Sequence, residues 1–515
     1  MLPYIKDNTF YLNNEPFIML AGEVHNSSSS DLGYMKEKVW PGIKGLNMNT
    51  LLVPVTWEAI EPEQDIFDFT LVRGLVEQAR EEGMRLVLLW FGLWKNGESF
   101  YVPGWMKKDT QRYFRARKYN GEAMNTISPF CEKAVERDAL AYRKLLEFIG
   151  SMDRQENTVI MVQVENEIGL LGTERDYSEA ARQVYRREVP GLISELYQRS
   201  GTWEDCFGKD AGEHMMCYAF ASAVERIAAS GREAYNLPCY TNAWLEQWPW
   251  EAGTYPSGGP VAKMHKLWKA AAPSLDCLAP DIYVPYVSKV LEEYAADTNP
   301  LLIPEIRQDA MHATYALYSI LEKHAICYSP FGIEDLKGAL SKEVSGSTTG
   351  ADLPPLAVLQ ELNIDLSAFQ IEGSAEIYSE IYAFIDHIKP LYYQFRNTGH
   401  LKCSLKRDSW HYGDIHEFEQ YRIKMKYKQN ESGKPISGGG ILELSENSFL
   451  VFGIRCRIEI LSLSFEHKRA GILQLSEVKV EKGKLRRRRI LNGDEVMSVS
   501  LGEGLTCLLV EVYKY

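Results

Sequence analysis

Short apolar runs that end in polar or aromatic residues recur eight times along the first two thirds of the chain. The clearest is 159–164, which is rich in β-branched residues and passes directly into Glu165, Asn166 and Glu167. An apolar run of this length predicts a strand buried on both faces. Because an unpaired buried charge is very costly, two carboxylates at its end indicate a strand that ends at a wet cleft.

The other seven runs share this arrangement. They lie at 17–22, 50–55, 85–91, 238–242, 275–280, 299–304 and 325–332. The clearest helical segments between the runs lie at 71–82, 131–151, 220–229 and 311–321. A strand followed by a helix, eight times over about 330 residues, predicts an α/β fold of the (β/α)8 or TIM barrel type. In such a barrel the functional groups lie at the carboxyl ends of the strands.

A second carboxylate, Glu305, stands at the end of the seventh run. Two parallel strands that each bring one carboxylate to the same edge of a sheet would form a carboxylate pair. Such a pair performs glycoside hydrolysis, so the sequence predicts a glycosidase if the strands form a barrel. The alternative is that these are ordinary strand ends that meet surface loops.

From residue 400 onward the chain changes to short strands separated by Gly and Asn turns. Strands are expected at 422–427, 449–452, 458–463 and 506–512, and turns at 437–440 and 492–493. This pattern predicts an antiparallel β-sandwich. We therefore expect a barrel domain at 1–398, closed by helices within 355–398, and a smaller all-β sandwich domain at 399–515.

Charge and composition argue against several classes of function. The formal net charge of −13 disfavours nonspecific binding to nucleic acid, and the basic run 486–489 is expected to be a solvated strand face. No stretch of the sequence is long and apolar enough to suggest a membrane span. The N-terminus lacks a secretory signal and the nine cysteines lack CxxC spacing, so we expect a cytoplasmic protein with reduced thiols. With no second His or Cys at ligand spacing near His25, and no nucleotide fingerprint, we expect no metal and no cofactor.

The two strand ends resemble a known group of enzymes. Asn166-Glu167 on the fourth strand and Glu305 on the seventh resemble the retaining β-glycosidases of clan A, which are barrels with catalytic residues on those strands. Within that clan, 162–169, Trp57 and the segment 61–69 are similar to the family 35 β-galactosidases.

Other segments refine the resemblance. Those at 89–96, 329–333 and 491–495 resemble a bacterial subgroup with an appended β-sandwich. Two regions depart from the family: 22–27 lacks the usual ending in His-Tyr, and the third strand lacks the usual sugar-binding cluster.

The resemblance implies a retaining exo-β-glycosidase that releases terminal β-linked galactose from oligosaccharides. Glu305 would be the nucleophile and Glu167 the acid/base, with carboxyl groups about 5 to 5.5 Å apart. Asn166 would bind the sugar 2-hydroxyl, and Tyr283 is expected to orient the nucleophile. Strict strand alternation would turn Asn166 and Glu167 to opposite faces, so the strand must bend or end here. Glu165 is expected to have a structural role.

Six further side chains are candidates for contact with the sugar. For stacking these are Trp57, Trp94 and Trp244, and for hydroxyl binding Glu23, His25 and Asn96. Two alternatives remain open: an exo-β-glycosidase for a glucoside, xyloside, fucoside or arabinoside, and a non-catalytic carbohydrate-binding protein on the same scaffold. Assembly into a homo-oligomer is also left open.

Overall fold

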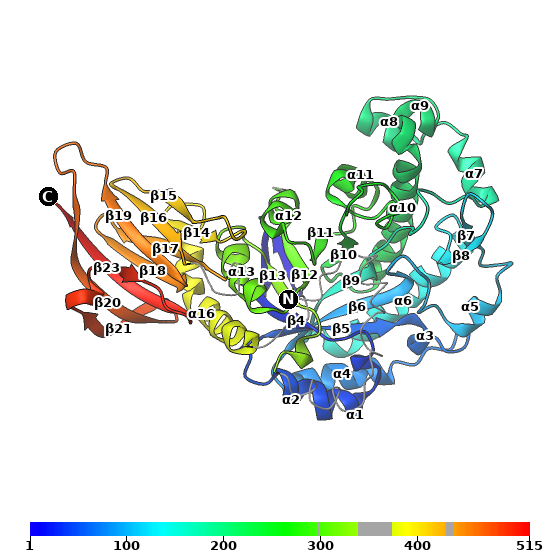
Figure 1. Ribbon diagram of the computed structural model, residues 1–515. Coiled ribbons are helices and arrows are strands. Elements are labelled where there is room, and N and C mark those ends of the chain that lie inside the picture. Colours follow the sequence, from blue (N-terminus) through cyan, green and yellow to red (C-terminus); the bar gives the residue numbers. More distant parts are fainter. Residues whose placement is uncertain (297, 338–372, 429–435) are drawn as a thin grey trace, which may run out of the picture.

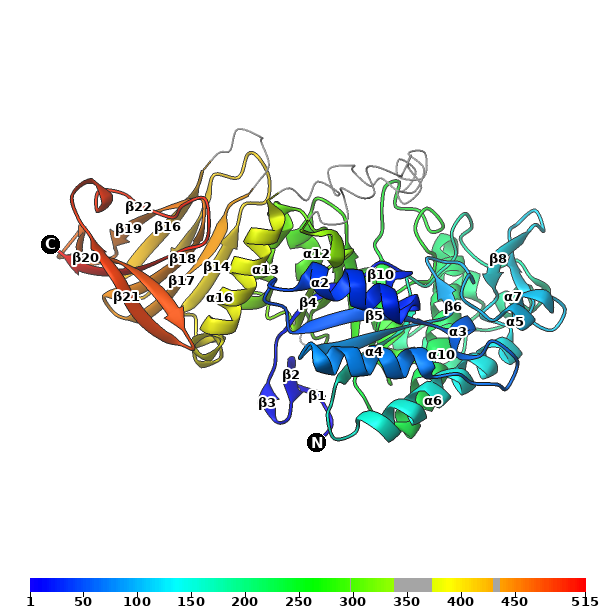
Figure 2. The ribbon, with the colours of Figure 1, turned by 90° about the horizontal axis from the view of Figure 1, so that it is seen from below.

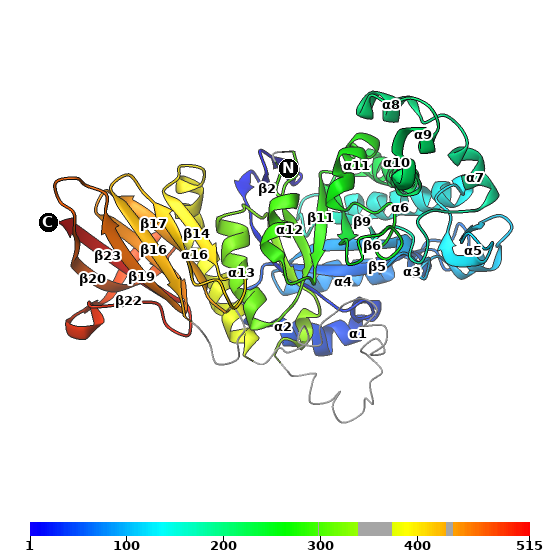
Figure 3. The ribbon, with the colours of Figure 1, turned by 45° about the horizontal axis from the view of Figure 1, so that its top comes forward.

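The computed structural model describes residues 1–296, 298–337, 373–428 and 436–515. A barrel and a set of antiparallel sheets lie side by side, with helix α16 (Ser374–Phe395) between them (Figure 1). The helices α7, α8 and α9 lie on the opposite side of the barrel from the sheets (Figure 3). Within the described ranges, no helix is both long and apolar enough to cross a bilayer.

Eight parallel strands close into a barrel, which confirms the predicted fold class. They are β4 (Met19–Glu23), β5 (Thr50–Thr56), β6 (Arg85–Lys95), β9 (Val159–Asn166), β10 (Cys239–Trp244), β11 (Cys277–Ile282), β12 (Leu302–Ile306) and β13 (Cys327–Pro330). Seven follow the predicted runs closely. β6 continues four residues beyond the predicted Phe91, and its last residue Lys95 is in register with Asn166 of β9.

The predicted helices cover the outside of the barrel. They are α4 (Thr70–Glu81), α6 (Glu132–Asp153), α10 (Ala211–Ala234) and α13 (Ala310–Leu321). α10 is much longer than predicted. α16 confirms the closing helix over 374–395, whereas 355–372 lies outside the described residues. Its Tyr382 hydroxyl donates to the carbonyls of Ala21 and Tyr328 (2.9 Å each), so α16 is anchored on β4 and β13.

Shorter elements fill the connections at the carboxyl ends of the strands. They are α1 (Leu32–Tyr34), α2 (Trp40–Ile43), α3 (Trp57–Ile60), α5 (Gly104–Lys108), β7 (Arg115–Arg117), β8 (Ala123–Ile127), α7 (Glu179–Tyr185), α8 (Gly191–Tyr197), α9 (Trp203–Phe207), α11 (His265–Ala271) and α12 (Val287–Tyr294).

The barrel is packed at its amino end and polar at its carboxyl end. A core cluster inside the strands includes Met19, Leu52 and Met161. A small sheet of β1 (Tyr4–Lys6), β2 (Thr9–Leu12) and β3 (Glu15–Pro16) adds Phe10 to this cluster and projects from the barrel near the N-terminus in Figure 2. The buried polar side chains Glu23, Asn166, Asp281 and Glu305 therefore gather toward the carboxyl ends of the strands.

The C-terminal sheets form the predicted sandwich. One sheet has the order β14 (Leu401–Leu405), β17 (Gly438–Ser445), β18 (Ser448–Ile454), β23 (Thr506–Lys514), β20 (Ala470–Glu481), β21 (Lys484–Leu491). The other has the order β15 (Gly413–Glu417), β16 (Tyr421–Tyr427), β19 (Cys456–Ser462), β22 (Val499–Ser500). Side chains such as Ile423 and Val451 form a common core between them. The exact boundary at 398–399 stays a prediction.

One predicted turn is wrong. Gly438 to Gly440 belong to strand β17 rather than to a turn. A side chain at Gly440 would collide with the ring of Phe452 and with the Cys403 sulfur, which lies 2.7 Å from its ideal Cβ position. Glycine is therefore present here because neighbouring chains approach closely.

The basic run 486–489 lies on the exposed edge strand β21, as predicted. Arg489 pairs with Glu477 (2.7 Å) and Arg486 pairs with Glu481 (2.9 Å). These exposed charges on an edge strand discourage pairing with another chain.

Candidate active site

The polar end of the barrel brings together side chains from six of its strands or the residues directly after them. They are Glu23, Lys95, Asn166, Glu167, Asn242, Asp281, Tyr283 and Glu305. Glu167 and Glu305 are only 7% and 5% exposed, so the site is set deep in the barrel.

Glu305 is held from two sides. The hydroxyl of Tyr283 donates to its Oε2 (2.8 Å), and the amide of Asn166 lies 3.4 Å from its Oε1. The Lys95 ammonium in turn donates to Asn166 Oδ1 (2.9 Å), which fixes the orientation of that amide. Burial, followed by the charge of Glu305, raises the pKa of Tyr283 well above its usual value, so its hydroxyl keeps the proton that it donates. This arrangement suits a Glu305 carboxylate.

The end of β9 bends as the sequence requires. Glu165 and Glu167 both have left-handed backbone conformations, with φ of 62° and 45°, on either side of Asn166. Such conformations are uncommon for residues other than glycine, and they break the strict alternation of the strand. The Glu167 N–H donates to Asn242 Oδ1 (3.0 Å), and the Asn242 amide donates to Asp281 Oδ2 (2.6 Å). Asn166 and Glu167 can therefore serve the same site.

The electrostatics of the site favour a protonated Glu167. Burial raises the pKa of Glu167 to about 8, and the neighbouring charge of Glu305 acts in the same direction, while Lys95 opposes both. A carboxyl group with such a pKa carries its proton at neutral pH and can act as a general acid.

Glu23 forms part of the floor of the site. Its side chain is fully buried, and neither carboxyl oxygen has a hydrogen-bond partner within the described part of the chain. Burial and then the charge of Glu305 raise its pKa well above the usual range. Because buried polar atoms almost always have partners, these oxygens suit contact with hydroxyl groups of a ligand.

Glu165 has the structural role expected for it. It turns away from the interior and accepts the N–H groups of Leu93 (3.1 Å) and Trp94 (2.6 Å) in β6. Asp138 of α6 accepts the same Leu93 N–H (2.8 Å). Gly92 leaves the space for these two carboxyl groups: a Cβ atom there would lie 2.5 Å from Glu165 Oε1 and would also collide with Asp138.

Two tryptophans expected to stack on a sugar lie elsewhere. Trp57 is fully buried in the core outside the barrel strands, where its indole donates to Glu61 (2.8 Å) and its ring packs against Trp90 and Trp105. Trp94 is fully buried in the same core and donates to the Ile127 carbonyl (2.9 Å). The assignment of Trp57 and Trp94 to sugar stacking is therefore corrected to a packing role.

The three remaining candidates lie at carboxyl ends of strands. His25 follows β4, and its ring nitrogen is 2.7 Å from Asp335. The Asn96 N–H donates to the Asn166 carbonyl (3.2 Å), beside the site. Trp244 is half-buried and ends β10. Their contact with a sugar stays a prediction.

Sequence reasoning missed Lys95, Asn242 and Asp281 as site residues. The chain order did place Asp281 at the end of a strand, but nothing local distinguished it from other strand ends. Among the residues described, no cluster of His, Cys, Asp and Glu has the arrangement of a metal site.

Comparison with known proteins shows which families the two parts of the chain resemble. Residues 9–255 match the model of glycosyl hydrolases family 35, and 378–501 match a domain of unknown function, DUF5597. The family 35 match covers just under half of the chain and supports a glycoside hydrolase. The family 35 match includes Asn166 and Glu167 but ends before Glu305.

Individual relatives are distant. A β-1,2-glucosyltransferase of Ignavibacterium album is 23% identical over 214 residues, which are 37% of this chain and 28% of that protein. This chain therefore matches little more than a quarter of the length of that curated relative. A solved β-galactosidase from Bacillus circulans sp. alkalophilus is 10% identical, with 96% of this chain and 99% of that chain covered and a TM-score of 0.49. The β-amylase catalytic domain of Paenibacillus polymyxa is 13% identical over 61% and 92% of the two chains, with a TM-score of 0.48.

Proposed function

We propose that the protein is a retaining exo-β-glycosidase and that it removes terminal β-linked galactose. The observation that carries the proposal is the pair of buried glutamates. Glu305 is oriented by donated hydrogen bonds, whereas Glu167 beside it has a pKa raised to about 8. A general acid that keeps its proton beside an oriented carboxyl group is the arrangement that double displacement requires.

The first half of the reaction uses Glu305 as nucleophile. Its carboxylate oxygen attacks the anomeric carbon, the bond to the leaving-group oxygen breaks, and Glu167 gives its proton to that oxygen. The product is a glycosyl ester on Glu305. Asn166, fixed by Lys95, lies next to the attacking oxygen, where it can bind the sugar 2-hydroxyl.

The second half reverses these roles. The Glu167 carboxylate takes a proton from water, the water oxygen attacks the anomeric carbon, and Glu305 leaves as a carboxylate. Two inversions retain the configuration of the sugar. The deep position of the glutamates suits a terminal sugar, and the resemblance to family 35 favours galactose.

The test is release of nitrophenol from a panel of β-linked nitrophenyl glycosides by the parent protein and by Glu305→Ala. We expect activity on the galactoside, a loss of about a thousandfold or more in the variant, and a β-configured sugar as first product by NMR. An α-configured first product would refute the double displacement. Activity on a different glycoside and none on the galactoside would leave the proposed mechanism standing but show that galactose is not the preferred sugar.

Analysis of the sugar products in the same reactions separates hydrolysis from transfer, since both release nitrophenol. A sugar hydroxyl that replaces water in the second step would give a new glycoside. Because the relative from Ignavibacterium album is named a β-1,2-glucosyltransferase, products formed with added glucose or galactose should be analysed as well. We expect free sugar as the main product.

A further inference from the structure

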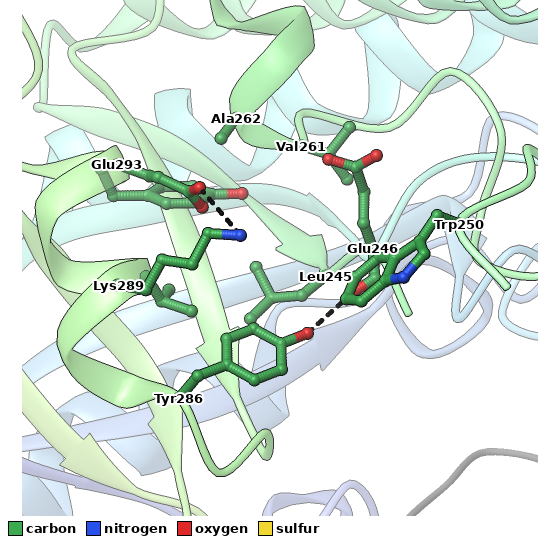
Figure 4. A pocket seen from close by; sticks show the side chains of 10 residues that line it. Leu245, Glu246, Trp250, Val261, Ala262, Tyr286, Lys289 and Glu293 are labelled. Atoms are coloured by element: carbon green, nitrogen blue, oxygen red, sulfur yellow. Dashed lines mark hydrogen bonds and ion pairs between the residues drawn. The ribbon is translucent and has the colours of Figure 1, made fainter. Parts of the chain in front are cut away.

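A pocket of about 120 Å³ lies beside the active site, between the chain that follows β10 and helix α12 (Figure 4). A closed cavity of about 150 Å³ holds one benzene molecule, so this smaller pocket, which is open to solvent, can receive one face of a sugar ring rather than enclose the whole ring. Its lining is Leu245, Glu246, Trp250, Val261, Ala262, Tyr286, Lys289, Val290, Glu293 and Tyr294.

Both walls of the pocket continue directly from strands of the active site. Glu246 stands two residues after Trp244, the last residue of β10. Tyr286 stands three residues after Tyr283, whose hydroxyl binds Glu305. Since three residues span at most about 11 Å, the Tyr286 wall lies within that distance of Tyr283 along the chain.

The lining combines aromatic and charged side chains, with Glu246 next to Trp250 in Figure 4. The rings of Trp250 and Tyr286 lie 6.3 Å apart, and Trp250 is 50% exposed although it is a large aromatic side chain. Lys289 and Glu293 of α12, which are 3.6 Å apart, face the pocket from the other side in Figure 4. A sugar ring offers matching groups, because it has an apolar face of C–H groups and a rim of hydroxyls.

The pocket is also rigidly supported. Lys263 binds Glu246 (2.9 Å) and Glu213 of α10 (2.9 Å), which ties the chain after β10 to a long helix. The hydroxyl of Tyr286 donates to the Glu246 carbonyl (3.2 Å) and joins the two walls. A pocket held in this way needs little ordering when a ligand binds.

We propose that this pocket is a subsite for the sugar unit on the leaving-group side of the scissile bond. The inference rests on the proposed function, because it takes the catalytic glutamates as the neighbouring subsite. Trp250 stacks on the apolar face of that sugar, and Glu246, Lys289 and Glu293 receive its hydroxyls. The natural substrate is then a β-linked oligosaccharide rather than a glycoside with a small leaving group.

The kinetic test compares two substrates that share the terminal galactose. β-Galactosyl fluoride has no sugar on the leaving-group side, whereas β-1,4-linked galactotetraose has three, the first of which would occupy the pocket. Trp250→Ala should lower kcat/KM for the tetrasaccharide about tenfold and leave the value for the fluoride unchanged. Trp248→Ala is the matched control: Trp248 is 73% exposed but does not line the pocket, so it should change neither value.

A binding test keeps this inference separate from the proposed function. Galactotetraose and cellotetraose are titrated calorimetrically into Glu305→Ala, alone and combined with Trp250→Ala or Trp248→Ala. Weaker binding only with Trp250→Ala supports the subsite even if the parent hydrolyses no galactoside. Any of three results would overturn the subsite: equal affinities in the three proteins, no binding of either tetrasaccharide, or a Trp250→Ala effect that follows a change in oligomeric state.

Discussion

Replacing Glu305 by Gln should lower the pKa of Glu167. In the parent, burial first and the charge of Glu305 second raise that pKa from 4.5 to about 8. This rise in pKa corresponds to a free-energy difference of about 5 kcal/mol between the protonated and ionised forms of Glu167. Two charges about 5.5 Å apart, at an effective dielectric constant near 20, repel by about 3 kcal/mol, which corresponds to about 2 in pKa. Loss of the Glu305 charge should therefore bring the pKa of Glu167 down to about 6.

The assay is a ¹³C-NMR titration of protein labelled at the glutamate δ-carbon, with the Glu167 signal assigned through its loss in Glu167→Gln. Lys95→Met is a control of opposite sign, because Lys95 lowers the pKa of Glu167 and its removal should raise it. A Glu167 pKa that is the same in the parent and in Glu305→Gln would show that the two carboxyl groups do not interact, and would refute the reasoning.

Three further predictions follow from single contacts. Tyr283→Phe removes the 2.8 Å hydrogen bond to Glu305. It should lower kcat on a nitrophenyl glycoside about ten- to a hundredfold with little change in KM. An unchanged kcat would contradict the orienting role of Tyr283. Gly92→Ala should cost about 1–3 kcal/mol in urea unfolding, because its Cβ meets two buried carboxyl groups, whereas Gly104→Ala, with open space around it, should cost much less. The parent should lose stability between pH 4.5 and 8, and Glu167→Gln should remove that loss. A carboxyl group with a raised folded-state pKa stabilises the fold fully below its unfolded-state pKa, and this contribution disappears as the pH rises to about 8. Unfolding midpoints that change in parallel for the two proteins over this range would contradict the prediction.

The barrel and its main site residues could be predicted because they depend on local patterns. Apolar runs specify buried strands, and the residue after each run lies at the carboxyl end of the barrel whatever the loops do. The pattern placed Glu167, Glu305 and Tyr283 at strand ends, where the structure brings them together, and their roles in catalysis stay predictions.

The errors have a common cause, which is that tertiary contacts decided the outcome. Trp57 and Trp94 follow strands as site residues do, but their rings turn into the outer core toward Glu61 and Ile127. Lys95 was missed because β6 continues beyond its apolar run to pair with the end of β9. Gly440 was assigned to a turn because no local pattern indicates the ring of Phe452 against it.

The central claim is that Glu305 forms a covalent bond to the sugar. The most direct test is incubation with 2-deoxy-2-fluoro-β-galactosyl fluoride, which slows both steps but leaves a good leaving group, followed by mass spectrometry of the intact protein and of its peptides. We predict one added fluorogalactosyl group per chain, on the peptide that contains Glu305, and no adduct in Glu305→Ala. An adduct on another residue, or turnover of galactosides by a protein that never forms an adduct, would contradict the proposed mechanism.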